Sequence, residues 1–301
     1  MNLRNAASSA PAPASAREPL GEMANPLGLL GVEFIEYATC KPQTLGQSLE
    51  RLGFRPLARH RSREVMLYRQ GDINIIVNAH RGADDPPLAE QARIAAVALR
   101  VRDAASAYRR VLDLGAWALP TQVEVMELNI PAIHGVSDSR IYFVDRVGEF
   151  SIYDVDFVPI PTVDPHPPAL GQMHLFGLVQ YIGLDRLADW CAFYGELFGF
   201  AELPPEHSFG VLPHGRILAS PCGTLFWQLI EPAPDALDID TQELLQRVAF
   251  GTPDVLATVA ELKRRGVEFV ESSAGVHSEA RGALTRPSDQ GPSFEFVHDP
   301  R

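Results

Sequence analysis

GVEFIEYAT, residues 31–39, alternates apolar and polar side chains in the way that a half-buried β-strand does. A helical pattern follows over Leu45–Leu52 and ends at Gly53, a residue type that is common just after a helix. Three more strand-like runs then follow, at Pro56–His60, Glu64–Arg69 and Ile73–Asn78. This part of the chain therefore predicts a βαβββ unit.

The same order of elements recurs along the chain. Three further helical stretches, Ala104–Leu114, Leu187–Phe198 and Val255–Arg265, are each followed by a glycine. The remaining strands are predicted at Ile94–Val101, Trp117–Gln122, Ser139–Asp145, Glu149–Asp156, His174–Gly183, Leu225–Ile230, Gln246–Gly251 and Ser293–Val297. These positions predict an α+β fold of four βαβββ units paired into two barrel-like domains, because one unit alone leaves a sheet face bare. A generic α+β sandwich without the fourfold repeat is the alternative.

Composition divides the chain into four segments. Residues 1–25 are rich in Ala, Ser and Pro and are predicted to form a disordered extension. The stretch PIPTVDPHPPALG, residues 159–171, holds five prolines and is typical of a linker. We therefore expect an N-terminal domain over residues 26–158 and a C-terminal domain over residues 172–301.

Charge and cysteine content exclude several classes of protein. The chain has 301 residues and a formal net charge of −12, with no basic cluster beyond short runs such as Arg59–Arg63, so we expect no nucleic-acid partner. Three widely spaced cysteines indicate neither a disulfide framework nor a thiolate zinc site. No apolar run is long enough to span a bilayer, and no signal peptide is evident. We expect a cytoplasmic protein that does not bind membranes.

Several segments carry a resemblance to a known family. In the first half they are GVEFIEYA (31–38), LGFRPLARHRSREVMLYRQGDINIIVN (52–78), LRVRDAASAYRRVLDLGAW (99–117), ELNIPAIHG (127–135) and IYFVDRVGEFSIYDVDF (141–157). In the second half they are MHLFGLVQ (173–180), WCAFYGELFGF (190–200), SPCG (220–223), LLQRVAFGTPDV (244–255) and FEFV (294–297). The chain resembles the bacterial 4-hydroxyphenylpyruvate dioxygenases of the vicinal oxygen chelate superfamily.

The resemblance implies both a fold and a chemistry. It implies paired βαβββ units in two vicinal-oxygen-chelate domains, the first of them structural and used in subunit contacts, so we expect a homo-oligomer. In the second domain the family holds a ferrous ion on two His and one Glu, with open positions for O₂ and for the substrate's 2-oxo acid. The implied reaction converts an aromatic 2-oxo acid, 4-hydroxyphenylpyruvate, to homogentisate in aromatic amino acid catabolism.

Two of the family's three metal-ligand positions are matched. His174 stands where the family has its first iron-binding His, and Glu295 stands where it has its Glu. Glu295 lies between Phe294 and Phe296, whose rings belong to the opposite face of the strand. A carboxylate that points into the concave side of the sheet is buried there and needs a cation, which either a metal or a basic side chain must supply.

The third ligand position is occupied by an arginine. The family's Gln-His-Ile-Ala-Phe segment is replaced here by Gln-Arg-Val-Ala-Phe, residues 246–250. A guanidinium has no lone pair and cannot bind iron. One hypothesis is that Arg247 replaces the metal and pairs with Glu295 in a bidentate bridge. The site would then be metal-free, or a pocket for an anionic ligand.

A second hypothesis keeps a metal. Glyoxalase-type relatives also take ligands from the last strand of a unit, where this chain has Gln228. His174, Gln228 and Glu295 could then hold Fe²⁺ or another divalent metal, while Arg247 binds a substrate carboxylate. His214, on the loop before residues 220–223, is a further candidate for substrate binding.

Two functions of different classes stay open. One is a dioxygenase-like oxidoreductase that acts on an aromatic 2-oxo acid. The other is a metal-free or glyoxalase-like member that binds an aromatic or anionic small molecule, or that has a lyase or accessory role, as in the dioxygenase-like domain fused to some 3-dehydroshikimate dehydratases. Three departures from the family favour the second function or a changed reaction. They are Arg247, Ile230 in place of a family Asn, and the end of the sequence at Arg301, before the family's C-terminal helix. We therefore do not expect homogentisate formation.

Overall fold

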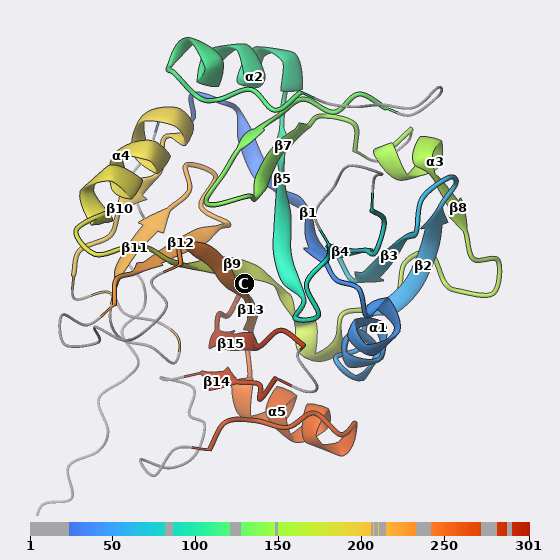
Figure 1. Ribbon diagram of the computed structural model, residues 1–301. Helices are drawn as coiled ribbons and strands as arrows, with labels where there is room; N and C mark the ends of the chain where they lie inside the picture. The colour runs from blue at the N-terminus through green and yellow to red at the C-terminus, as the bar shows by residue number, and fades with distance from the viewer. Residues whose placement is uncertain are drawn as a thin grey trace, which may run out of the picture.

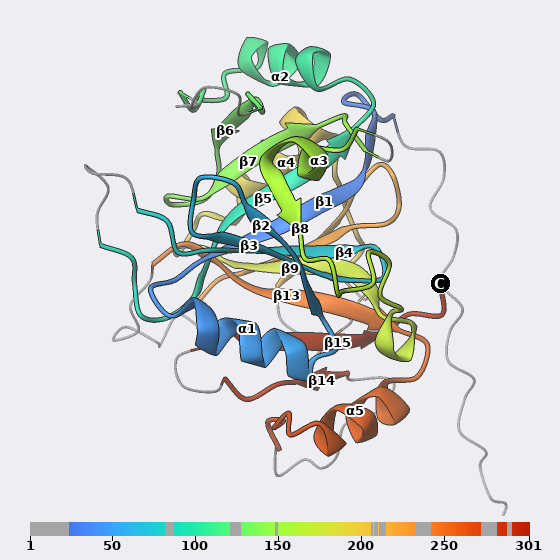
Figure 2. The same ribbon diagram turned by 90° about the vertical axis from the view of Figure 1, so that its right-hand side faces the viewer.

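Two mixed β-sheets with a few α-helices make up the protein, so the predicted α+β class is confirmed. The computed structural model describes residues 24–81, 87–120, 128–147, 150–205, 207, 210, 215–232, 242–271, 282–287 and 291–301. Helices α2 and α5 lie at opposite ends of the molecule, with the sheets between them (Figures 1 and 2). No helix in this described part is long and apolar enough to cross a membrane.

The first sheet has eight strands in the order β6-β7-β5-β1-β4-β3-β2-β8. Their bounds are β1 Leu29–Ala38, β2 Arg55–His60, β3 Val65–Gln70, β4 Ile73–Asn78, β5 Arg93–Val101, β6 Ala132–His134, β7 Arg140–Val144 and β8 Phe157–Pro159. Strand β1 pairs in parallel with β4 and antiparallel with β5. Together with helix α1 (Pro42–Arg51), strands β1 to β4 form the first βαβββ unit that the sequence predicts.

The second sheet has seven strands in the order β10-β11-β12-β9-β13-β15-β14. Their bounds are β9 His174–Tyr181, β10 Ala201–Glu202, β11 Arg216–Ala219, β12 Phe226–Ile230, β13 Leu244–Thr252, β14 Ala283–Leu284 and β15 Phe294–His298. The antiparallel pair β9 and β13 takes the central place that β1 and β5 take in the first sheet. Each sheet is therefore built from two successive units that meet at their first strands.

Helices α2 and α5 begin at side-chain caps, and the four helices that the sequence predicts end within one residue of their predicted last residue. The described helices after α1 are α2 Ala104–Asp113, α3 Ile152–Asp156, α4 Leu187–Phe198 and α5 Val255–Arg264, with a short 3₁₀ turn at Leu170–Gln172. The carboxylates of Asp103 and Asp254 accept hydrogen bonds from the backbone N–H groups of Ser106 and Ala257, which stabilises the first turns of α2 and α5. Helix α4 ends at Gly199, which has a φ of 75°.

One predicted strand is wrong over its described residues, and another is reduced. Residues 149–156 were expected to be extended, but α3 begins at Ile152, because Ser151 and Asp154 form a capping box that starts a helix. The described part of the predicted strand at residues 117–122 is reduced to a single bridge between Ala118 and Ile133. Among the described residues, the second unit is therefore shorter than the first.

Neither sheet closes into a barrel through pairing of the described strands. The strand order is linear, with β6 and β8 at the edges of the first sheet and β10 and β14 at the edges of the second. The barrel-like shape of each domain stays a prediction. The predicted linker runs along the first sheet, where the backbone N–H of Gly71 donates to the carbonyl of Pro167 at 2.8 Å.

One hydrophobic core joins the two halves of the chain. Ring pairs cross between the halves, with centroid distances of 5.9 Å for Phe54 and Phe250 and 6.1 Å for Tyr37 and Phe294. The other face of the second sheet carries a separate, smaller cluster that includes Phe176, Phe226, Ala249 and Val297. Gln228 and Glu295, two of the residues singled out in the sequence, lie next to this smaller cluster.

Candidate functional site

An ion pair between Arg247 and Glu295 lies at the centre of the second sheet. The two residues belong to the parallel neighbours β13 and β15, in which Ala249 is level with Glu295. The Nε atom of Arg247 donates to the Oε2 atom of Glu295 at 2.7 Å, and each side chain is 2% exposed. The contact between Arg247 and Glu295 that the first hypothesis describes is therefore present in the structure.

The pair is not bidentate, which corrects the expected geometry. The Nη1 atom of Arg247 donates to the side-chain oxygen of Gln246 at 3.2 Å, and its Nη2 atom is buried without a partner among the described residues. The register of β13 against β9 shifts between Leu245 and Arg247, so Gln246 occupies a β-bulge. The bulge turns the Gln246 side chain toward the guanidinium, which then meets the carboxylate through Nε.

The cavity beside the ion pair is very small. Its volume is about 10 Å³, which is room for about one water molecule. Gln228 and Glu295 both line it, together with Phe176, Gly177, Leu178, Val179, Phe226, Ala249 and Val297. A Cβ atom at Gly210 would lie 2.0 Å from the Oε1 atom of Glu295, so the backbone at Gly210 lies directly against the carboxylate.

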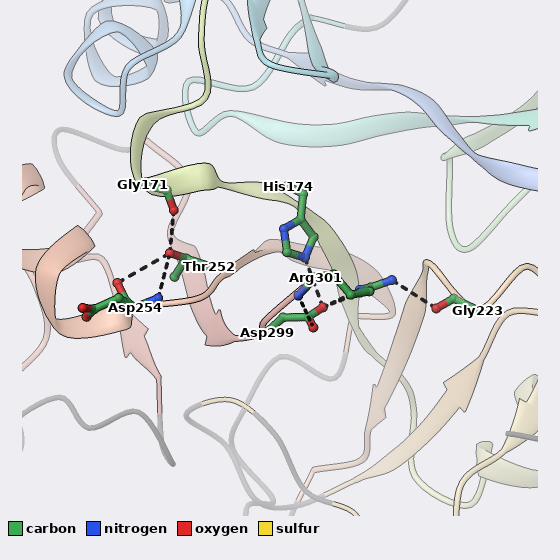
Figure 3. A network of polar contacts seen from close by, with 7 residues as sticks. All are labelled: Gly171, His174, Gly223, Thr252, Asp254, Asp299 and Arg301. Carbon is green, nitrogen blue, oxygen red and sulfur yellow. Dashed lines mark hydrogen bonds and ion pairs between the residues drawn. The ribbon is translucent and has the colours of Figure 1, made fainter. Parts of the chain in front are cut away.

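His174 belongs to a different polar network. Its Nε2 atom lies 3.1 Å from the Oδ2 atom of Asp299, a carboxylate that is 2% exposed and that also accepts from Nε of Arg301 at 2.7 Å (Figure 3). The Nη1 atom of Arg301 donates to the carbonyl of Gly223 at 3.1 Å. The ring of His174 packs against the backbone of Gly251, where a Cβ atom would be 2.3 Å from Nε2.

The donor set of the described residues does not fit the iron triad that the resemblance implies. Arg247 offers no lone pair, the charge of Glu295 is matched by the guanidinium at 2.7 Å, and Nε2 of His174 points at Asp299. The described residues include no group of three His, Cys, Asp or Glu side chains arranged to hold a metal ion. No hydrogen bond joins His174 to Glu295 in this part of the chain.

The remaining sequence candidates are placed as follows. Gln228 lies level with Val179 on the neighbouring strand β9 and is 5% exposed, so the structure brings it to the cavity of Glu295. His214 lies outside the described residues. Asp299 is the partner of His174 that the sequence reasoning missed. Asp299 directly follows the end of β15, four residues after Glu295, so continued alternation of that strand would place the two carboxylates on the same side.

A buried polar group on the core side of the second sheet also has a structural role. The hydroxyl of Tyr194 donates to the side-chain oxygen of Gln180 at 2.7 Å, and the indole N–H of Trp227 donates to the same oxygen at 3.0 Å. Burial raises the pKa of Tyr194 well above its ordinary value, because the charged phenolate would be desolvated. Tyr194 therefore stays neutral and fixes α4 to β9 and β12.

Comparison with known proteins finds similar proteins that match most of the chain. The family model for the N-terminal domain of hydroxyphenylpyruvate dioxygenase matches residues 23–158. A 4-hydroxyphenylpyruvate dioxygenase from Pseudomonas sp. (strain P.J. 874) is 36% identical over 85% of this chain and 75% of that protein. Hemolysin VllY from Vibrio vulnificus is 35% identical over 82% of this chain and 73% of that protein.

Solved structures show the same architecture. A fusion protein of a xylose isomerase-like TIM barrel and a 4-hydroxyphenylpyruvate dioxygenase superposes with a TM-score of 0.71 and 26% sequence identity. The match covers 91% of this chain and 50% of the fusion protein, so this chain is similar to about half of that protein's length.

Proposed function

This chain belongs to the 4-hydroxyphenylpyruvate dioxygenase family of the vicinal oxygen chelate superfamily, and we propose that it is a member that binds a small organic acid without iron-dependent oxidation. The observation that carries the proposal is the buried contact of 2.7 Å between Arg247 and Glu295, on two of the three strands that would supply the iron ligands. In this proposal residues 172–301 form the domain that has lost the metal centre, and the ion pair lies within that domain.

The charges at the pair oppose metal binding. A divalent cation beside Glu295 would be repelled by the guanidinium, and the repulsion between charges a few ångströms apart is strong where water is excluded. If Arg247 released the carboxylate to a metal, its own charge would stay buried without a counter-ion, which is costly. The guanidinium of Arg247 therefore supplies to Glu295 the positive charge that the metal supplies elsewhere in the family.

The size of the cavity at Glu295 argues against an aromatic 2-oxo acid at that place. Pockets that bind small molecules usually measure roughly 300–1,000 Å³. The cavity lined by Gln228 and Glu295 measures about 10 Å³. An organic acid that binds this chain would need a different cavity.

Oxygen uptake tests the proposal. The purified chain is loaded with Fe²⁺ without oxygen and then exposed to oxygen and 4-hydroxyphenylpyruvate, while an electrode measures oxygen and chromatography measures homogentisate. The 36% identical Pseudomonas dioxygenase, treated in the same way, is the positive control. We expect no uptake above that of the chain without iron. Uptake with one homogentisate formed per oxygen would overturn the proposal.

A metal-dependent function is the second candidate, and one observation favours it. Gln228 and Glu295 line the same cavity, so two oxygen donors already converge there. In this alternative Fe²⁺ or another divalent metal would bind His174, Gln228 and Glu295 after Arg247 moves aside. Gln228→Ala would then lower the metal content of the loaded protein while circular dichroism shows an unchanged fold. Equal metal content in both proteins would exclude Gln228 as a ligand.

A further inference from the structure

We propose that a cavity between the two halves of the chain binds a small organic carboxylate with an apolar body. This seam cavity is lined by Arg51 and Leu52 at the end of α1 and by Val267, Glu268, Arg286 and Phe294 from the second half. Its volume is about 370 Å³, within the range of roughly 300–1,000 Å³ that is usual for small-molecule sites. Figure 2 shows the elements that border it, with α1 near β15 and above α5.

The charges in the seam cavity favour an anion. Arg51 and Arg286 enter it from the two halves of the chain, and Glu268 is the acidic residue in its lining. Arg51 forms no ion pair with any described residue, whereas Nη1 of Arg286 lies 3.8 Å from Oε2 of Glu268 in an ion pair whose side chains are 60% and 74% exposed. This lining therefore carries a net positive charge in a chain whose formal charge is −12. A guanidinium binds a carboxylate through two parallel hydrogen bonds.

One part of the wall of the seam cavity is apolar and rigid, while polar surface makes up the larger part of the lining. Leu52 and Phe294 are both 2% exposed, so each presents only a small surface of a well-packed side chain. The ring of Phe294 is stacked on Phe250 at 5.6 Å and contacts Tyr37 at 6.1 Å, which fixes its position. Pro287 and Pro292 also line the cavity and have no backbone N–H to offer. The lining therefore suits a ligand with a charged head and an apolar body.

The seam cavity also explains where a ligand would bind. The inference rests on the proposed function, in which the chain binds an organic acid. The seam cavity, at about 370 Å³, has room for such an acid, whereas the cavity beside Glu295, at about 10 Å³, has not. Because residues of both halves line the cavity, a bound ligand would also connect the two halves.

Calorimetric titration with three small probes tests the inference. Benzoate has the charge and the apolar body, acetate has only the charge, and benzyl alcohol has only the body. We expect benzoate to bind about tenfold more tightly than either of the others, because a charge-assisted hydrogen bond and an apolar contact each contribute about that factor. Equal binding of benzyl alcohol and benzoate would contradict the proposal.

Variants locate the site. Arg51→Gln and Arg286→Gln should each weaken benzoate binding about tenfold, because each removes a charged donor. Arg264→Gln is the matched control, since it removes an exposed arginine of α5 that pairs with Glu261 outside the cavity. Ser48→Phe places a ring in the cavity without removing either arginine and should abolish binding.

Unchanged benzoate binding in both Arg51→Gln and Arg286→Gln would overturn the seam cavity as the site. That result would leave the iron-independent function standing, because it is tested separately by oxygen uptake. Oxygen uptake with homogentisate formation would overturn the proposed function while leaving the titration with benzoate interpretable.

Discussion

Arg247 and Glu295 face each other across the parallel strands β13 and β15, with Nε and Oε2 2.7 Å apart and both side chains 2% exposed. A buried carboxylate is tolerated only with a nearby positive charge, and here the guanidinium supplies it. In the family that this chain belongs to, the resemblance places an iron-binding His and Glu at these two positions. The ion pair therefore joins the same two strands that a metal ion would join.

Removing the arginine alone should strongly destabilise the protein. Arg247→Met keeps an unbranched side chain, shorter than that of arginine, and leaves Glu295 buried without a counter-ion. We expect the free energy of unfolding to fall by about 3–5 kcal/mol, measured by urea denaturation. The double variant Arg247→Met with Glu295→Leu should recover most of this loss, because an apolar pair avoids the desolvation of both charges.

An exposed ion pair is the control for that experiment. Arg216 pairs with Glu202 at 2.6 Å, but the two side chains are 42% and 41% exposed. Arg216→Met should therefore lower the free energy of unfolding by less than about 1 kcal/mol. If Arg247→Met costs no more than Arg216→Met, the buried pair is not the structural centre of the second sheet.

The negative charge of Asp299 should contribute to the stability of the folded protein. Asp299→Asn keeps the shape but weakens the bonds from His174 and Arg301, and hydrogen bonds to charged groups contribute about 1.5–3 kcal/mol each. We expect a loss of stability in that range on urea denaturation. Asp254→Asn is the control, because asparagine caps a helix about as well as aspartate. A loss no larger than that of the control would show that the Asp299 charge is not needed.

The close approach of Gly251 to His174 can be tested by adding one methyl group. In Gly251→Ala the Cβ atom would lie 2.3 Å from Nε2, so the ring must move away from Asp299. We expect a destabilisation of about 1–3 kcal/mol, as is usual for an overpacked site. The double variant Gly251→Ala with Asp299→Asn should lose less stability than the sum of the two single-variant losses, because both substitutions break the same contact. Strict additivity would show that His174 keeps its contact in Gly251→Ala.

Much of the fold was predictable because it depends on local patterns. The alternation in residues 31–39 predicted β1, and the glycines after the helical stretches marked the helix ends. The strand expected over residues 149–156 was wrong for the described residues, because a capping box between Ser151 and Asp154 starts α3 there. That local signal was present in the sequence but was outweighed by the apolar alternation around it.

The sequence indicated which residues form the site, but not how their side chains are arranged. The chemistry of arginine alone showed that Arg247 could not be a metal ligand. Its pairing with Glu295 was one of two hypotheses, and the other placed a metal at Glu295. The bulge at Gln246, which directs Nη1 away from the carboxylate, depends on the register between β13 and β9. The contact between His174 and Asp299 spans 125 positions in the sequence and likewise depends on how the strands are aligned.

Stability should fall at alkaline pH because of buried tyrosines. Burial raises the pKa of Tyr37, Tyr153 and Tyr194 above the ordinary value of about 10. Below about pH 10 each tyrosine is protonated in both states, and its contribution to stability is constant. Above that pH the unfolded state loses protons that the folded state keeps, so the free energy of unfolding falls as pH rises.

The slope of that fall can be measured. Each buried tyrosine contributes at most about 1.4 kcal/mol per pH unit. Urea denaturation between about pH 9 and pH 11.5 should therefore show a shallower fall for Tyr194→Phe than for the unchanged chain. Equal slopes would mean that Tyr194 ionises in the folded protein, in conflict with its burial and its bond to Gln180.

The most direct test of the central claim is the affinity for Fe²⁺ of three proteins: the unchanged chain, Arg247→His and Arg247→Gln. The measurement is anaerobic equilibrium dialysis followed by elemental analysis. If the guanidinium occupies the place of the metal, Arg247→His should bind iron orders of magnitude more tightly than the unchanged chain. Arg247→Gln, which removes the charge without adding an imidazole, should gain far less. Stoichiometric iron in the unchanged chain, or equal affinity in all three proteins, would contradict the account.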